Sequence, residues 1–254
     1  MAHHQTRREF TGLLLASALG APFVLTRRTP PPGARLTFRP RAASGAGADA
    51  GPQPLGLGGE RDGVLYVPRG YQPDRPVPLL LALHGATGSS RGPIRNFGPV
   101  ADDLGVALVV PDSRLRTWEA ILSGEFSVDR DFIDRSLALA AARVSVDPRR
   151  IGVVGFSDGA TYAIALGRAN GDVFQAVSAF SPGFIIDVTP VGRPAFFISH
   201  GTHDHILPID QCSRKIVPAL EDAGYRVDYR EFDGDHEIPP AIALAGLKSA
   251  AGGA

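Results

Sequence analysis

The residues best suited to covalent chemistry lie at positions 155–159, which read Gly-Phe-Ser-Asp-Gly. Composition alone would produce a G-x-S-x-G pattern about 0.2 times in a chain with this much glycine, so the setting decides its meaning. The pattern follows an apolar run and precedes a segment with helical spacing, the strand–turn–helix arrangement that holds a serine on a sharp turn. We therefore predict that Ser157 is a nucleophile at a helix N-terminus, where developing negative charge is stabilised. The alternative is a glycine-rich turn with a capping serine.

A serine hydroxyl is a poor nucleophile unless a base removes its proton. His236 follows one predicted strand near the C-terminus, and Asp204 follows the strand before it. After Ser157 the acid comes first and the histidine second, which is the chain order found in enzymes that carry such a turn. We predict that His236 is the base and that Asp204 orients its ring and stabilises the imidazolium ion.

We expect the other acids and the other imidazole considered as triad members to have structural roles. We interpret Asp210 as a helix cap, Asp233 and Asp235 as turn residues, and His84 as a structural group at the end of a strand, because it precedes Ser157. Cys212, the only cysteine, permits no intramolecular disulfide and lies in an amphipathic segment without a base beside it.

A cluster of imidazoles raises the possibility of a metal site at His200, His203, Asp204 and His205. Imidazole-rich sites bind zinc. However, neighbouring residues of an extended loop point in different directions, so we expect neither a metal nor a cofactor.

Two backbone N–H groups are expected to stabilise the oxyanion that forms on a substrate carbonyl. One belongs to Asp158, directly after the nucleophile, with its carboxylate directed away. The other belongs to Ala86, in the small-residue loop after an earlier strand. Trp118, the only tryptophan, follows the strand at 105–112 and either lines the substrate pocket or packs in the core.

Hydrophobic patterns predict the elements that must position these residues. Continuous apolar runs indicate strands covered on both faces, at 63–68, 78–85, 105–112, 150–157, 176–182, 194–201 and 226–234. Helical stripes lie at 132–144, after Ser157, and from Ile209 to Leu220, where Pro218 should kink or shorten the helix. This alternation predicts an α/β fold with a mostly parallel, doubly wound sheet, helices on both faces and little or no lid.

The remaining sequence divides the chain. Residues 1–26 combine a basic start, the pair Arg7-Arg8 and an apolar stretch, which resembles a twin-arginine export signal and predicts an exported protein; an uncleaved anchor is the alternative. Residues 27–59 read as a Pro/Gly/Ala-rich linker with a short edge strand at 35–40, and residues 60–249 as the catalytic domain. A formal net charge of zero gives no sign of a nucleic-acid partner.

Four motifs together resemble a known family. They are "LLLALHGATGSS", "GVVGFSDGATYAIALG", "FISHGTHDHILPI" and "FDGDHEIP", in this order. They resemble the phospholipase/carboxylesterase family of α/β hydrolases and the related polyhydroxybutyrate depolymerase-like esterases. The resemblance implies the α/β-hydrolase fold, a triad of Ser157, Asp204 and His236, oxyanion N–H groups at Ala86 and Asp158, and a carboxylic ester substrate.

The motifs do not select one substrate. A small ester, a lipid and a polyester all remain open, as does the oligomeric state. Two other functions share the pattern: a serine peptidase of the prolyl-oligopeptidase type, and a non-catalytic binding protein on a hydrolase scaffold. The first usually carries an additional gating domain, and the second tends to lose a triad member.

Overall fold

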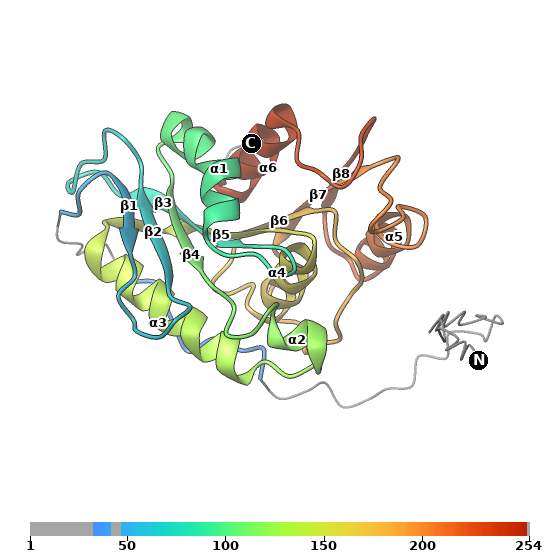
Figure 1. The fold of residues 1–254 in the computed structure, drawn as a ribbon, viewed down its shortest axis with the longest axis horizontal. Helices are drawn as coiled ribbons and strands as arrows, with labels where there is room; N and C mark the ends of the chain where they lie inside the picture. Colours follow the sequence, from blue (N-terminus) through green and yellow to red (C-terminus); the bar gives the residue numbers. More distant parts are fainter. Residues whose placement is uncertain (1–32, 42–46, 253–254) are drawn as a thin grey trace, which may run out of the picture.

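The computed structural model describes residues 33–41 and 47–252, which form one sheet with helices on both faces (Figure 1). Its strands, in the order in which they lie side by side, are β1 (Gly51–Pro54), β2 (Gly63–Val67), β4 (Ala107–Pro111), β3 (Val77–Leu83), β5 (Val146–Phe156), β6 (Ala176–Phe180), β7 (Ala195–Gly201) and β8 (Val227–Phe232). Its helices are α1 (Arg91–Leu104), α2 (Glu119–Leu122), α3 (Ser127–Arg143), α4 (Asp158–Ala169), α5 (Ser213–Asp222) and α6 (Pro240–Ala250).

The six strands from β4 to β8 across the sheet are parallel, while β2 runs antiparallel to both β4 and β1. The carboxyl ends of β3 to β8 therefore lie at one edge. The strand order reverses at β3, which has β4 on one side and β5 on the other. In open α/β sheets, ligands bind outside the carboxyl ends near such a reversal.

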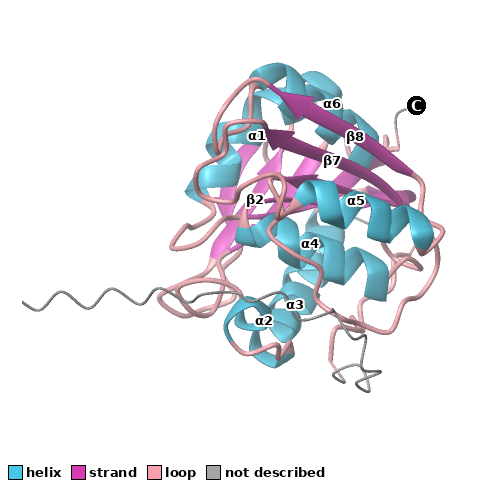
Figure 2. Cartoon of the chain, turned by 90° about the vertical axis from the view of Figure 1, so that its right-hand side faces the viewer, coloured by secondary structure: helices cyan, strands magenta, loops and turns pink. Residues whose placement is uncertain are grey.

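The side chains of β3 alternate between the two faces of the sheet, and both faces are covered. Residues 79–83 are fully buried, yet Leu79, Leu81 and Leu83 belong to one hydrophobic core and Leu80 and Ala82 to the other. Side chains of successive strand residues point to opposite faces, so a strand covered on both sides must be apolar throughout. Helices α3, α4 and α5 contribute to the first core, and α1 and α6 to the second (Figures 1 and 2).

The predicted α/β fold with a mostly parallel sheet is confirmed, and each predicted strand from residue 63 onward is present with small changes at its ends. The connection from β6 to β7, residues 181–194, contains neither helix nor strand. No helix in the described part of the chain is long and apolar enough to cross a membrane.

The structure corrects one expected helix and contains others that were not predicted. Helix α5 begins at Ser213, later than predicted, and continues beyond Pro218, because Val217 and Leu220 are buried against the core. Helix α1 contains glycine and proline and was not predicted, although Phe97 and Ala101 are buried on its inner face. In both helices, tertiary packing offsets poor intrinsic propensity.

The predicted edge strand at 35–40 is wrong. Residues 33–39, which we call the N-terminal strap, have no regular secondary structure and cross helices α3 and α4. The backbone N–H of Leu36, a residue only 2% exposed, donates to Asn170 Oδ1 at 2.8 Å, and Asp134 accepts from the backbone of Thr37 and Phe38. The backbone of the strap thus bonds to side chains of Asn170 and Asp134 and not to the backbone of a neighbouring strand.

Within residues 27–59 it is β1 that forms an edge strand of the sheet, and Leu55 after it is fully buried. Parts of 27–59, expected to be a linker, therefore belong to the folded domain. The expected export signal at 1–26 lies outside the described residues.

Candidate active site

Ser157 lies on the turn between β5 and α4 and has a strained backbone. Its φ and ψ angles are 56° and −122°, which non-glycine residues rarely adopt. The turn is held by the N–H of Ser157, which donates to the carbonyl of Phe180 at 2.9 Å, and by the Ser157 carbonyl, which accepts from Ala160 and Thr161. Such strain persists only where the surroundings enforce it, and it is concentrated at functional sites.

The two glycines of the pattern are required by close backbone contacts. A Cβ atom on Gly155 would meet the carbonyl of Gly159, and one on Gly159 would meet the carbonyls of Leu83 and His84. Each contact would be closer than 3.0 Å, a separation that real Cβ atoms essentially never show. The absence of both side chains lets α4 start directly against the end of β3 and holds Ser157 at the edge of the sheet.

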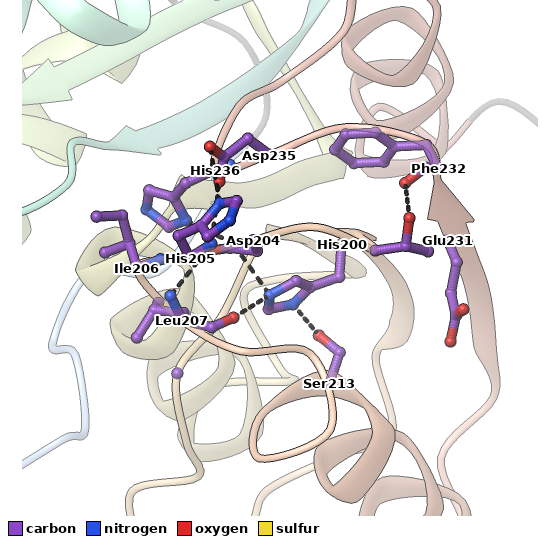
Figure 3. A network of polar contacts seen from close by, with 12 residues as sticks. His200, Asp204, His205, Ile206, Leu207, Ser213, Glu231, Phe232, Asp235 and His236 are labelled. Atoms are coloured by element: carbon purple, nitrogen blue, oxygen red, sulfur yellow. Dashed lines mark hydrogen bonds and ion pairs between the residues drawn. The ribbon is translucent and has the colours of Figure 1, made fainter.

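His236 and Asp204 form a close pair on the loops after β8 and β7. The Nδ1 atom of His236 lies 2.7 Å from Asp204 Oδ2, and the Asp204 side chain is fully buried (Figure 3). The other oxygen, Oδ1, accepts from the backbone N–H groups of Ile206 at 2.9 Å and Leu207 at 2.7 Å. Burial alone would raise the pKa of Asp204, but the bonds from Leu207 and His236 outweigh it and hold the pKa below its usual value.

The imidazole of His236 is adjacent to the nucleophile turn. Its ring packs against that of Phe156, the residue before Ser157, with 4.7 Å between the ring centroids. The hydrogen bonds found among the described residues include that of His236 to Asp204 but none between His236 and Ser157. In the absence of substrate, a catalytic hydrogen bond is often long or poorly aligned, and it tightens when the substrate binds.

The two loops that carry the acid and the base are joined by their own hydrogen bonds. Asp235 Oδ1 accepts from the backbone N–H groups of His205 at 3.0 Å and His236 at 2.8 Å, and the N–H of His203 donates to the carbonyl of Gly234 at 2.9 Å. Asp235, interpreted from sequence as a turn residue, therefore fixes the position of His236 relative to the preceding loop.

The imidazoles considered as metal ligands point in different directions. His203 lies 3.1 Å from Asp233, and His205 lies 3.2 Å from Asp235, and both side chains are mostly exposed. His200 is fully buried and its Nε2 atom lies 3.1 Å from Asp204 Oδ2. In residues 33–41 and 47–252, no group of three or more His, Cys, Asp or Glu side chains is arranged to hold a metal ion.

The loop after β3 lies directly beside Ser157. A Cβ atom on Gly85 would be 3.2 Å from that of Ser157, and Ala86 follows on the exposed part of the loop. Asp158 is the first residue of α4, so its N–H has no acceptor within the helix. Its carboxylate accepts a 2.6 Å hydrogen bond from Thr117 Oγ1, which fixes the direction of the side chain.

His84 and Arg61 hold this loop in place through hydrogen bonds. His84 Nε2 accepts from the N–H of Ser113 at 3.0 Å, and burial lowers the pKa of His84. Arg61 donates to the carbonyl of Gly88 at 2.7 Å. The sequence identified His84 as structural but gave no sign of Arg61, which precedes β2 and reaches the loop only in the folded chain.

Trp118, for which the sequence left a pocket role and a packing role open, is a core residue. It has no exposed surface, so it cannot line an open pocket. Its indole N–H donates to the carbonyl of His84 at 2.8 Å, and its ring stacks on that of Tyr162 with 5.2 Å between centroids. The packing role left open by the sequence is the one that the structure supports.

Comparisons with known proteins agree with this architecture. Residues 111–236 match the model of the dienelactone hydrolase family. Feruloyl esterase C of Emericella nidulans is 31% identical over 157 residues, which cover 59% of this chain and 57% of that protein. The chain is therefore similar to these hydrolases over about half of its length. The predicted resemblance to an esterase family is confirmed at this level.

Further proteins are similar to this chain in sequence or in fold. The putative esterase NocK of Nocardia uniformis is 30% identical over 146 residues, which cover 54% of this chain and 42% of that protein. The chain thus spans about half the length of these curated relatives. The esterase PE8 structure has a TM-score of 0.60 at 21% identity, covering 76% of this chain and all of that one. S-formylglutathione hydrolase FrmB of Staphylococcus aureus has a TM-score of 0.64 at 16% identity, covering 84% and 99%.

The contact of Gly159 with β3 leads to a test of stability. We expect Gly159→Ala to lower the free energy of unfolding by about 1–3 kcal/mol, because the added methyl group must push the backbone of α4 away from β3. Gly92→Ala is the matched control, since a Cβ at Gly92, also near a helix start, meets nothing within 4 Å. That control should gain about 0.5–1 kcal/mol from helix propensity. Urea unfolding measures both, and equal effects would refute the close-contact account.

Proposed function

We propose that this chain hydrolyses carboxylic esters through an acyl-enzyme formed on Ser157. The observation that carries the proposal is the strained turn at Ser157 beside an imidazole that is itself bonded to a buried carboxylate. A structural turn would need neither the strain nor the paired imidazole. The relatives named as esterases support the same reaction class.

The first half of the reaction transfers the acyl group to the enzyme. Ser157 Oγ attacks the ester carbonyl carbon while His236 Nε2 accepts the hydroxyl proton. Asp204 stays ionised, because its pKa is held low, and stabilises the imidazolium ion through Nδ1. The backbone N–H groups of Ala86 and Asp158 bind the oxyanion. When the tetrahedral intermediate collapses, His236 returns the proton to the departing alcohol.

The second half releases the acid. Water attacks the acyl carbon, His236 accepts a proton from that water, and the carboxylic acid leaves as the proton returns to Ser157 Oγ. The same three side chains thus serve both halves, and no cofactor takes part in the proposed reaction.

Exposed apolar side chains on the loops at the carboxyl edge of the sheet support an ester with an apolar or aromatic acid as the substrate. Phe184, 48% exposed, and Ile206, 68% exposed, lie on the loops after β6 and β7. These loops approach each other, since a Cβ atom on Gly183 would lie 3.6 Å from Leu207. Because relatives are named feruloyl esterases, methyl ferulate is the first aromatic ester to test.

We expect the purified chain to hydrolyse p-nitrophenyl acetate and methyl ferulate, and Ser157→Ala to lower kcat/KM by about 10⁴-fold or more, because the nucleophile is lost. Ser123→Ala, at an exposed position distant in sequence, is the matched control and should retain full activity. Initial rates from absorbance measure both. Full activity of Ser157→Ala would refute the proposal, and faster turnover of an anilide than of the matching ester would favour a peptidase.

We further propose that the chain is exported. The basic start, Arg7-Arg8 and the apolar stretch within residues 1–26 support this. Replacing both arginines by lysine should leave the protein inside the cell, because the twin-arginine route depends on that pair. Fractionation of bacteria expressing the full chain tests this, and unchanged export of the variant would contradict it.

A further inference from the structure

A second imidazole, that of His200, shares the carboxylate proposed to orient the base. Its Nε2 atom lies 3.1 Å from Asp204 Oδ2, the same oxygen that His236 Nδ1 contacts at 2.7 Å (Figure 3). Together with the two backbone N–H groups on Oδ1, four donors surround this buried carboxylate. The proposed reaction accounts for the contacts of Ile206, Leu207 and His236 but gives His200 no role.

The neighbours of His200 determine which of its nitrogens carries the hydrogen. Nε2 faces two acceptors, the carbonyl oxygen of Leu207 at 2.8 Å and Asp204 Oδ2, so it must be the donor. Nδ1 lies 2.7 Å from the hydroxyl oxygen of Ser213, which can donate to it (Figure 3). The side chain is fully buried, and burial lowers the pKa of His200, which favours the neutral ring.

We propose that His200 is a positioning residue of the active site: its Nε2–H, shared between the Leu207 carbonyl and Asp204 Oδ2, fixes the carboxylate and partly balances the negative charge that faces His236. This inference rests on the proposed ester hydrolysis. The bond limits how strongly Asp204 stabilises the imidazolium form of His236. It also opposes rotation of the carboxylate, because Oδ2 would then move away from His200 Nε2 as well as from His236 Nδ1.

The other charged and titratable groups near this pair lie on several elements. His205 and Asp235 belong to the two loops, Glu231 on β8 is the register partner of His200, and Cys212 precedes α5. The pKa of Glu231 is lowered chiefly by its hydrogen bond to Arg214, and that of Asp235 by backbone donors, so both remain ionised near neutral pH. The charges of Glu231 and Asp235 are therefore constant near neutral pH.

The first test compares two substitutions in the full chain. His200→Leu removes the donor, so we expect kcat/KM for p-nitrophenyl acetate to fall about tenfold with little change in KM. The pH at which kcat/KM reaches half its maximum should rise by about half a unit, because Asp204 then stabilises the imidazolium more strongly. His200→Gln retains an N–H donor and should restore this midpoint. His203→Gln, on the exposed part of the same loop, is the matched control and should behave like the unmodified protein.

A purely structural role for His200 would lower the yield of folded protein without moving the pH midpoint. An unchanged midpoint in folded His200→Leu, or equal midpoints for the Leu and Gln variants, would therefore overturn the inference.

The second test does not depend on activity. Long-range 15N NMR of the full chain should show His200 as the neutral Nε2–H form at pH 7. An Nδ1–H form or a charged ring would overturn the inference, even if His200→Leu fails to fold. If the unmodified chain hydrolyses no ester, the proposed function fails separately, and the NMR result still decides the His200–Asp204 bond.

Discussion

The contact between the start of α4 and the end of β3 is the constraint on which the site depends. Because Gly159 lacks a side chain, α4 lies against the end of β3, and because Gly155 lacks one, the turn before α4 is tight enough to hold Ser157 in its strained conformation. The same contact brings Gly85, and with it the loop that carries Ala86, against Ser157. The position of the nucleophile and that of the proposed oxyanion donors are thus set by a single packing interaction between backbones.

The acid and the base depend on a second constraint, the cost of burying a charge. A carboxylate withdrawn from water is destabilised unless donors surround it, and Asp204 has four, from Ile206, Leu207, His200 and His236. These donors fix both of its oxygens and bring the loops after β7 and β8 together. Asp235 holds the same two loops from the exposed side. The imidazole proposed as the base is therefore oriented before substrate arrives.

The sequence predicted what depends on local pattern. Continuous apolar runs identified the parallel strands, and the chain order of Ser157, Asp204 and His236 led to the proposed triad. Features that depend on tertiary contacts were missed or left open. The strap around Leu36 is bound by side chains of distant helices, and the choice between a pocket role and a core role for Trp118 depends on its contacts with Tyr162 and His84. His200 was considered only as a metal ligand, since no local signal reveals that it turns inward towards Asp204.

The most direct test of the account is the site and rate of covalent labelling by a fluorophosphonate. After reaction with the full chain, mass spectrometry of proteolytic peptides should find the adduct on Ser157. Labelling of His236→Gln should be slower by about a hundredfold, because the hydroxyl has lost its base. An adduct on another residue, or an equal rate in the variant, would contradict the proposal that these side chains act together.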